Sequence, residues 1–415
     1  MKRNVNLRLG TLAVTLGLCF GTTAYAETVK LAVIDPLSGT FAALGENQLR
    51  TWEYIADLAN KEGWGGKYQL EVVGFDNKAG VQDSLSQLKR AIDQGYRFVA
   101  QANGSGVAFA LVDAINKHNA RNPGKEVVYL NHGAIDPGLT NDQCSFWQFS
   151  VDSNVDMKMQ ALVNHLAKNK DVKKVYIIGQ NYAFGRSVSK AAKEMLAEKR
   201  PDVEIVGDDL HPIGEVKDFS PYVAKIIASG ADTVITGNWG TDLALLIRAA
   251  RDAGLDADFY TYYAVLKGSP TAIGESGLEH VNYVGVWNVN NEDYKGRDLV
   301  EGFKEKYDDD LTWLQAYSGV ALLTNAMKKA DSDDPVDVAF ALEGMELDSL
   351  NGKIKMRAAD HQLQQPLYIA TWSKTNDSNV QLEQEDTGFG WRTEEVIPAE
   401  QAELPTICKM KRPQR

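Results

Sequence analysis

The segment VKLAVIDPLSGTFAALG, from Val29 to Gly45, decides the fold of this chain. Its first six residues are apolar apart from one lysine, which is typical of a strand that is buried in a sheet. A turn containing Ser-Gly follows at once and leads into a helix, which is the strand–turn–helix unit of α/β proteins. The segment therefore predicts a mostly parallel sheet with helices on both faces.

The same alternation of strand and helix recurs along the chain in two series. The intervening helices show apolar residues at helical spacing, as in Val81, Leu85, Leu88 and Ile92. The strands expected in the first series are Val29 to Ile34, Leu70 to Phe75, Arg97 to Ala100 and Val127 to Leu130. Those expected in the second are Val175 to Ile178, Val203 to Val206 and Thr233 to Thr236. Two series predict two doubly wound lobes.

Lapses in this pattern predict where the chain crosses between the lobes. They fall at Asp142 to Asp152, around Val281 to Asn288, and within Leu350 to Trp372. A helical stretch from Leu311 to Ala330 is expected to cover the first lobe again. The predicted division is a first lobe at 27–149 and 286–348 and a second lobe at 150–285 and 349–415, which includes the C-terminal tail. Three crossings make a hinge, and the cleft beside it can close on a ligand.

Residues 1–26 have the features of a cleaved export signal. These are a positive start at Lys2, Arg3 and Arg8, an apolar run at 9–20 and an Ala-Tyr-Ala cleavage site at 24–26. Leu18 stands where a lipid anchor on Cys19 would need a small residue, which disfavours anchoring. We therefore expect a soluble, periplasmic product.

The net charge indicates which binding partners to exclude, and the cysteine content indicates a disulfide. The whole chain has a formal charge of −12, and removing three positive residues with the signal gives −12 minus 3, or −15. That balance argues against nucleic acid and anionic membranes. An oxidising compartment would let Cys144 and Cys408 pair, with two free buried thiols as the alternative.

Sequence signals for catalysis or cofactors are weak. The six histidines form no H-x-x-x-H pair, and no G-x-G-x-x-G or Walker lysine follows the first strand. The serines of Gly104-Ser105-Gly106 and Glu275-Ser276-Gly277 lack the glycine spacing of a nucleophile elbow. We expect no cofactor, no metal and no enzymatic activity.

Loops after strands offer a candidate binding site, since open α/β sheets bind ligands at the carboxyl ends of their strands. Gln101 to Gly106 follows the third strand and opens a helix, so its amides, the helix dipole and the Ser105 hydroxyl could hold an anion. The alternative is that Ser105 only caps the helix. A second tight loop at Asn131 to Ala134 could face the same cleft.

Aromatic residues follow the strands of the second lobe. Tyr182, Phe184 and Trp239 lie in such loops, and Tyr262 and Tyr263 lie in a further aromatic stretch. Each alone could simply pack within its lobe. Together they predict an aromatic wall of the cleft.

Several stretches in order resemble the periplasmic leucine/isoleucine/valine-binding proteins, the type I solute-binding fold of ABC importers. They are VKLAVIDPLSG, RFVAQANGSG, NHGAIDPGLT, VYIIGQNYAFGRS and DTVITGNWG. The resemblance implies two lobes with three crossovers, no catalysis and permease subunits as partners. It puts the carboxylate-binding serine at Ser105 beside Gly104, the backbone-amide loop at Gly133 and Ala134, and the aromatic wall at Tyr182 or Phe184 and at Trp239.

Two positions depart from the family pattern. Ile135 stands where a threonine hydroxyl usually follows the amide loop, and Tyr263 stands where an acidic residue would balance a ligand's ammonium group. A buried ammonium without an anion is strongly unfavourable, unless Asp35 or Asp242 compensates.

The leading hypothesis is thus a monomeric periplasmic receptor for a small carboxylate-bearing solute, either amino-acid-like or an aromatic or other organic acid. The carboxylate would bind at Ser105, and the apolar body of an aromatic or other organic acid would lie between Tyr182, Trp239 and Tyr263. The alternatives are a branched-chain amino-acid binder, a sensory ligand-binding protein and, least favoured, a secreted amidase-type enzyme.

Overall fold

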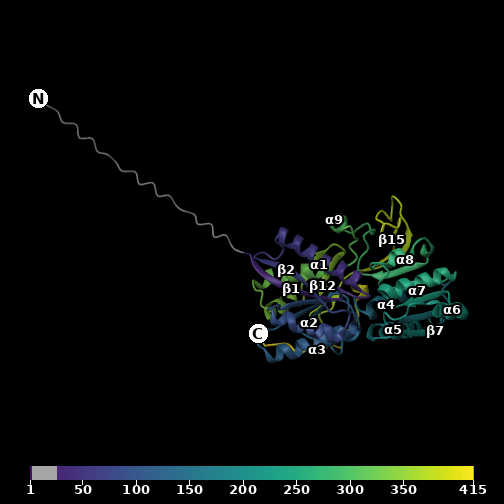
Figure 1. Cartoon of the computed structure of the whole chain (residues 1–415), viewed down its shortest axis with the longest axis horizontal. Coiled ribbons are helices and arrows are strands. Elements are labelled where there is room, and N and C mark those ends of the chain that lie inside the picture. Colours follow the sequence, from purple (N-terminus) through teal and green to yellow (C-terminus); the bar gives the residue numbers. More distant parts are fainter. Residues whose placement is uncertain (2–25, 415) are drawn as a thin grey trace.

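The computed structural model describes residue 1 and residues 26–414, so most of the expected signal peptide lies outside the described residues. Figure 1 shows two α/β lobes side by side, one built mainly from the purple and blue parts of the chain and the other from the teal part. Each lobe contains its own sheet with helices on both faces, which confirms the predicted two-lobe α/β fold.

The first lobe contains a parallel five-stranded sheet of order β2-β1-β3-β4-β5. Its strands are β1 (Glu27–Asp35), β2 (Tyr68–Asp76), β3 (Phe98–Gln101), β4 (Val128–Asn131) and β5 (Gln148–Ser150), and its helices are α1 (Ala42–Glu62), α2 (Val81–Asp93) and α3 (Ser105–Arg121). The strand order reverses between β1 and β3, and ligands of doubly wound sheets bind at such switch points.

The strand β5 corrects the prediction for Asp142 to Asp152, which was interpreted as a crossover. Residues 148–150 still pair in parallel with β4, and the crossing begins only after Ser150. The aromatic residues of this stretch, Phe146 and Phe149, are buried in the core.

The second lobe contains a seven-stranded sheet of order β15-β14-β10-β9-β8-β6-β7. Its parallel strands are β6 (Lys174–Gln180), β7 (Glu204–His211), β8 (Thr233–Thr236), β9 (Asp258–Thr261) and β10 (Val281–Gly285). Its helices are α4 (Val155–Leu166), α5 (Ala183–Lys199), α6 (Ser220–Ser229), α7 (Gly240–Asp252) and α8 (Ser269–Ile273). The order β7-β6-β8-β9-β10 repeats that of the first lobe, and β14 (Leu367–Lys374) and β15 (Phe389–Ile397) add an antiparallel edge.

After β10 the chain returns to the first lobe. The elements here are α9 (Arg297–Tyr307), α10 (Gln315–Ala330), α11 (Pro335–Leu342), β11 (Glu346–Ser349), β12 (Gly352–Met356) and β13 (Leu363–Gln364). The helix α10 packs against α1. The predicted boundary between residues 348 and 349 falls inside β11, which pairs with β12, so the predicted division cuts through one hairpin.

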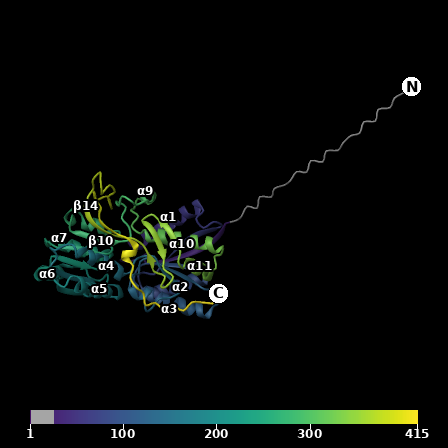
Figure 2. The ribbon, with the colours of Figure 1, turned by 180° about the vertical axis from the view of Figure 1, so that it is seen from behind.

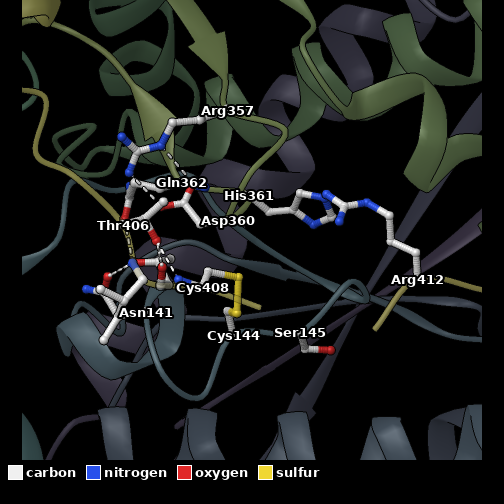
Figure 3. Close-up of a disulfide and its surroundings, with 12 residues drawn as sticks. Asn141, Cys144, Ser145, Arg357, Asp360, His361, Gln362, Thr406, Cys408 and Arg412 are labelled. Carbon is white, nitrogen blue, oxygen red and sulfur yellow. Dashed lines mark hydrogen bonds and ion pairs between the residues drawn. A yellow bond between two sulfur atoms is a disulfide. The ribbon is translucent and has the colours of Figure 1, made fainter. Parts of the chain in front are cut away.

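The C-terminal tail runs back from β15 through the short helix α12 (Ala399–Ala402) to the first lobe, as the yellow ribbon in Figure 2 shows. Cys144 and Cys408 form a disulfide there, with their Cα atoms 5.7 Å apart, so the predicted pair is present (Figure 3). Thr406 donates a hydrogen bond to the carbonyl of Thr140, and Arg357 donates to the carbonyl of Leu404. Within residues 26–414, no helix combines the length and the hydropathy needed to cross a membrane.

Candidate functional site

A small cavity lies between the two lobes, at the carboxyl ends of strands from both sheets. The first lobe contributes Ala102, Asn103, Gly104, Ser105, Gly133 and Trp313 to its wall. The second lobe contributes Tyr182, Phe184, Trp239, Tyr263 and Leu266. Seven of the eight predicted site residues therefore lie around one cavity, the exception being Ala134.

The start of α3 forms one part of the cavity wall. Gly104 is the N-cap residue and has φ +95°, a conformation that favours glycine. Ser105 is the first residue of the helix, so the alternative that Ser105 caps α3 is wrong. Its hydroxyl oxygen accepts a hydrogen bond from the amide of Asp136 at 3.3 Å, which leaves its proton to donate elsewhere. Since first-turn amides lack intrahelical acceptors, this corner of the cavity suits an anion.

The second predicted loop contributes differently from what the resemblance implies. The amides of Gly133 and Ala134 both donate to Asn131 Oδ1, at 3.2 and 2.8 Å, so each already has an acceptor within its own lobe. A Cβ atom on Gly133 would lie 2.5 Å from the indole of Trp313. Glycine at position 133 therefore makes room for an aromatic wall residue.

The second lobe contributes aromatic side chains to the cavity wall, two of which are hydrogen-bonded to each other. The indole nitrogen of Trp239 donates to the hydroxyl oxygen of Tyr182 at 2.7 Å. Burial raises the pKa of Tyr182 far above its usual value, so the phenol stays protonated. Because its oxygen accepts from Trp239, the Tyr182 hydroxyl keeps its own proton for another acceptor.

Tyr263 links both lobes and the hinge. Its hydroxyl lies 3.1 Å from the carbonyl oxygen of Gly133 and 3.2 Å from Oδ2 of Asp152. Its ring stacks on Trp313 with 5.9 Å between ring centroids, and Nζ of Lys158 lies 4.8 Å from the ring centroid on Tyr263. First burial and then the Asp152 carboxylate raise the pKa of Tyr263 well above its ordinary value. At this position the chain thus has a neutral group that bridges the lobes.

Neither carboxylate considered as a compensating anion lies on the cavity wall. Asp35 is fully buried and accepts hydrogen bonds from the amides of Ala102 and Asn103. Asp242 accepts from the Gln180 side chain and the Gly214 amide, both at 2.8 Å. Among the described residues that line the cavity, none is acidic.

Contacts between the lobes close over the cavity. Ser187 on α5 donates to Asp136 Oδ2 of the first lobe at 2.6 Å. Lys267 of the second lobe pairs with Asp309 of the first. The ring centroids of Phe41 and Trp239 lie 4.5 Å apart across the cleft. The structure is therefore a closed one.

Sequence reasoning missed Trp313 and Leu266 as wall residues, and it named Ala102 and Asn103 only as part of the loop before Ser105. Trp313 was included in the predicted helix from Leu311, but α10 begins at Gln315. The preceding residues are held to α1 instead, since Thr312 donates to Asn47 Oδ1 at 2.8 Å. A tryptophan two residues before the start of a helix was the available signal. In the part of the chain that the structure describes, no cluster of three His, Cys, Asp or Glu side chains could hold a metal ion.

A profile of the periplasmic binding protein family matches residues 28–378. The chain belongs to this family. A curated relative, Leu/Ile/Val-binding protein homolog 4 of Brucella melitensis, is 30% identical over 427 residues and the alignment covers all of both chains. The recognition made from the sequence is therefore confirmed.

Solved structures agree with this assignment. The leucine-, isoleucine-, valine-, threonine- and alanine-binding protein of Brucella ovis, in its closed conformation, has a TM-score of 0.82 at 29% identity, covering 94% of this chain and all of that one. A solute-binding protein of an R. palustris ABC transporter, in complex with benzoate, has a TM-score of 0.77 at 19% identity, covering 92% and 100%. The fold is thus that of the type I periplasmic binding proteins.

Proposed function

We propose that this protein is the periplasmic binding component of an ABC importer and that it captures a compact carboxylate that carries no ammonium group. The observation behind this is the composition of the cavity wall, which offers hydroxyl and amide donors and five aromatic rings but, within the described residues, no acidic side chain. A carboxylate gains from such donors, whereas a buried ammonium group would lack a counter-charge.

The carboxylate is proposed to bind at the start of α3. The Ser105 hydroxyl has its proton available there, and the Tyr182 hydroxyl offers a second proton from the opposite lobe. A ligand that bonds to both lobes favours the closed state by its differential affinity for the two states. Closure would then be the signal read by the permease subunits of the importer.

The apolar body of the ligand is proposed to lie among the rings of Phe184, Trp239, Tyr263 and Trp313. Flat aromatic rings fit between aromatic walls of this kind at little entropic cost. Two similar folds carry benzoate and 4-hydroxybenzoate, respectively, which makes benzoate a suitable first probe.

A branched-chain amino acid is the second candidate. The names of the 30% and 29% identical relatives favour it, since both refer to leucine, isoleucine and valine. The two candidates differ in one chemical group, the ligand's ammonium. Sensing in place of transport would use the same site and differ only in the membrane partner.

A thermal-shift titration with matched probes separates the candidates. The protein is unfolded and refolded to remove carried-over ligand and then titrated with leucine, with 4-methylpentanoate, which is leucine without its amino group, and with benzoate. A ligand at a hundredfold its Kd should stabilise by about 2.7 kcal/mol. We expect stabilisation by the two amine-free acids. Stabilisation by leucine alone would refute the proposal in favour of the amino-acid binder.

A serine pair tests the position of the carboxylate. Ser105→Ala should weaken binding of the active probe about tenfold, since it removes a hydrogen bond to a charged group. Ser84→Ala is the control, because that hydroxyl bonds to the carbonyl of Gly80 within α2 and does not line the cavity. Equal affinities of the two variants would place the carboxylate elsewhere.

A further inference from the structure

A carboxylate buried directly behind the cavity is not accounted for by the proposed ligand contacts. Asp35 lies at the end of β1 with no exposed surface, and His132 beside it is equally buried. His132 Nε2 lies 3.1 Å from Asp35 Oδ2, and the indole nitrogen of Trp313 lies 2.6 Å from His132 Nδ1. The three side chains form a chain of hydrogen bonds from the sheet to the cavity wall.

The direction of these hydrogen bonds follows from the chemistry of the groups. An indole N–H can only donate, so His132 Nδ1 must accept from Trp313. The imidazole proton is then on Nε2, from which it is donated to the Asp35 carboxylate. The ring of Trp52 packs edge-on against the imidazole, with 5.2 Å between the ring centroids.

The same carboxylate also holds the loop before α3. Asp35 Oδ1 accepts from the amides of Ala102 and Asn103, at 3.1 and 3.0 Å, and from Asn103 Nδ2 at 3.0 Å. Within the described residues, the donors to this carboxylate are thus backbone and side-chain N–H groups, and no lysine or arginine pairs with it. Two separate parts of the cavity wall, the loop and Trp313, depend on one buried group.

We propose that Asp35 is the positioning residue of the ligand cavity. It fixes the indole of Trp313 through His132, and it occupies the amides of Ala102 and Asn103. The ligand's carboxylate is thereby directed to Ser105 and the first turn of α3, where donors stay free. This inference deepens the proposed function and rests on it for the ligand, but the hydrogen-bond chain itself can be tested without one.

The close fit at Gly133 supports this role. A Cβ there would meet Trp313 at 2.5 Å and the Cβ of Ala102 at 2.9 Å. Trp313 and the loop are therefore packed against the same glycine as well as bonded to the same carboxylate. A displacement of either part would be transmitted to the other, because packed interiors have little free volume.

The wild-type protein provides the first test. In 15N-labelled, ligand-free protein at neutral pH, long-range NMR correlations should show the His132 proton on Nε2. The Trp313 indole signal is identified by its loss in Trp313→Phe. A proton on Nδ1 of His132 would overturn the chain of hydrogen bonds, whatever the ligand is.

The variant Asp35→Asn provides the second test. An amide has one acceptor oxygen and one donor nitrogen, so its NH2 group must face either His132 or the amides of the loop. Either the hydrogen bond to His132 or those from the loop amides must therefore break. We expect the Trp313 indole signal, or the amide signals of Ala102 and Asn103, to shift. Asp242→Asn, which changes a buried carboxylate of the other lobe, should leave them in place. Unmoved signals in Asp35→Asn would refute the positioning role.

Ligand affinity then separates this inference from the proposed function. Asp35→Asn should weaken binding of the active probe about tenfold without contacting it, and combining it with Trp313→Phe should cost less than the sum of the two single effects. Additive losses would mean that Asp35 does not act through Trp313. If neither benzoate, 4-methylpentanoate nor leucine binds, the proposed function fails while the two NMR outcomes still decide the role of Asp35.

Discussion

The lobes meet at the mouth of the cavity and again at the hinge, and the two contacts differ in their chemistry. At the mouth, partly exposed polar pairs such as Ser187–Asp136 and Lys267–Asp309 cross the cleft. At the hinge, Asp152 and Lys158 form an ion pair at 2.9 Å with only 1% of either side chain exposed. Contacts of the first kind can exchange for water when the cleft opens, whereas contacts of the second kind cannot.

Further hydrogen bonds join the first crossing at the hinge to the third crossing and to α10. Gln362 donates to the carbonyl of Asp152 at 2.7 Å, and Gln365 donates to that of Val151 at 2.9 Å. Gln315 donates to Asp152 Oδ2 from the start of α10. Burial lowers the pKa of Lys158, and the Asp152 carboxylate opposes that shift. The comparison teaches that the hinge contacts stabilise the fold, whereas the contacts at the mouth can break and re-form as the cleft opens and closes.

The largest effect should come from breaking the hinge pair. Lys158→Met leaves the Asp152 carboxylate buried without its cation, which should cost about 3–5 kcal/mol of unfolding free energy. Urea denaturation measures it. Lys168→Met is the matched control, because the Lys168 side chain is 66% exposed and its pair with Glu395 should contribute less than about 1 kcal/mol. Similar losses in both variants would remove the distinction between hinge and surface.

Removal of the disulfide should cause the second largest loss of unfolding free energy. Replacing Cys144 and Cys408 together by serine removes a cross-link between residues 264 positions apart, and we expect a loss of about 2–4 kcal/mol. Reduction of the disulfide in the wild-type protein should lower Tm by as many degrees as the double substitution does. Because the disulfide lies on the hinge side, ligand affinity should stay within about twofold. A large loss of affinity with little loss of Tm would place the tail's role at the cleft instead.

The smallest effect on the unfolding free energy should come from a substitution at the mouth of the cavity. Ser187→Ala removes one hydrogen bond between the lobes, which should weaken ligand binding about fivefold and leave the unfolding free energy within about 0.5 kcal/mol. Isothermal titration with the active probe measures this. Ser189→Ala on the same helix is the control, because that hydroxyl bonds to Asp208 within the second lobe. An equal loss of affinity in the control would show that the helix, and not the contact across the cleft, matters.

Regular parts of the fold could be predicted from the sequence. Buried parallel strands such as Val29 to Ile34 are apolar apart from Lys30, and the helices between them show apolar residues at helical spacing, so the two lobes could be predicted. The strand β5 was not, since its three residues, Gln148 to Ser150, are too short to show a pattern. Its place is set by pairing with β4, which is a long-range contact.

The candidate site was predictable where a residue follows a strand. Ser105, Tyr182 and Trp239 come within four residues of a strand's end, and the topology alone brings such loops to one edge. Trp313 was missed because it reaches the cavity from a segment far along the chain. The engagement of the Gly133 and Ala134 amides by Asn131 and the role of Asp35 behind the loop depend on hydrogen bonds that no local pattern encodes.

The separation of 264 residues between the paired cysteines also bears on how the protein is made. At a synthesis rate of about 5–20 residues per second, Cys408 emerges roughly 13–50 s after Cys144. Throughout that interval the Cys144 thiol has no partner from the tail. The cross-link between the tail and the first lobe can therefore form only after nearly the whole chain has been made, and until then Cys144 has to be kept from pairing with other thiols.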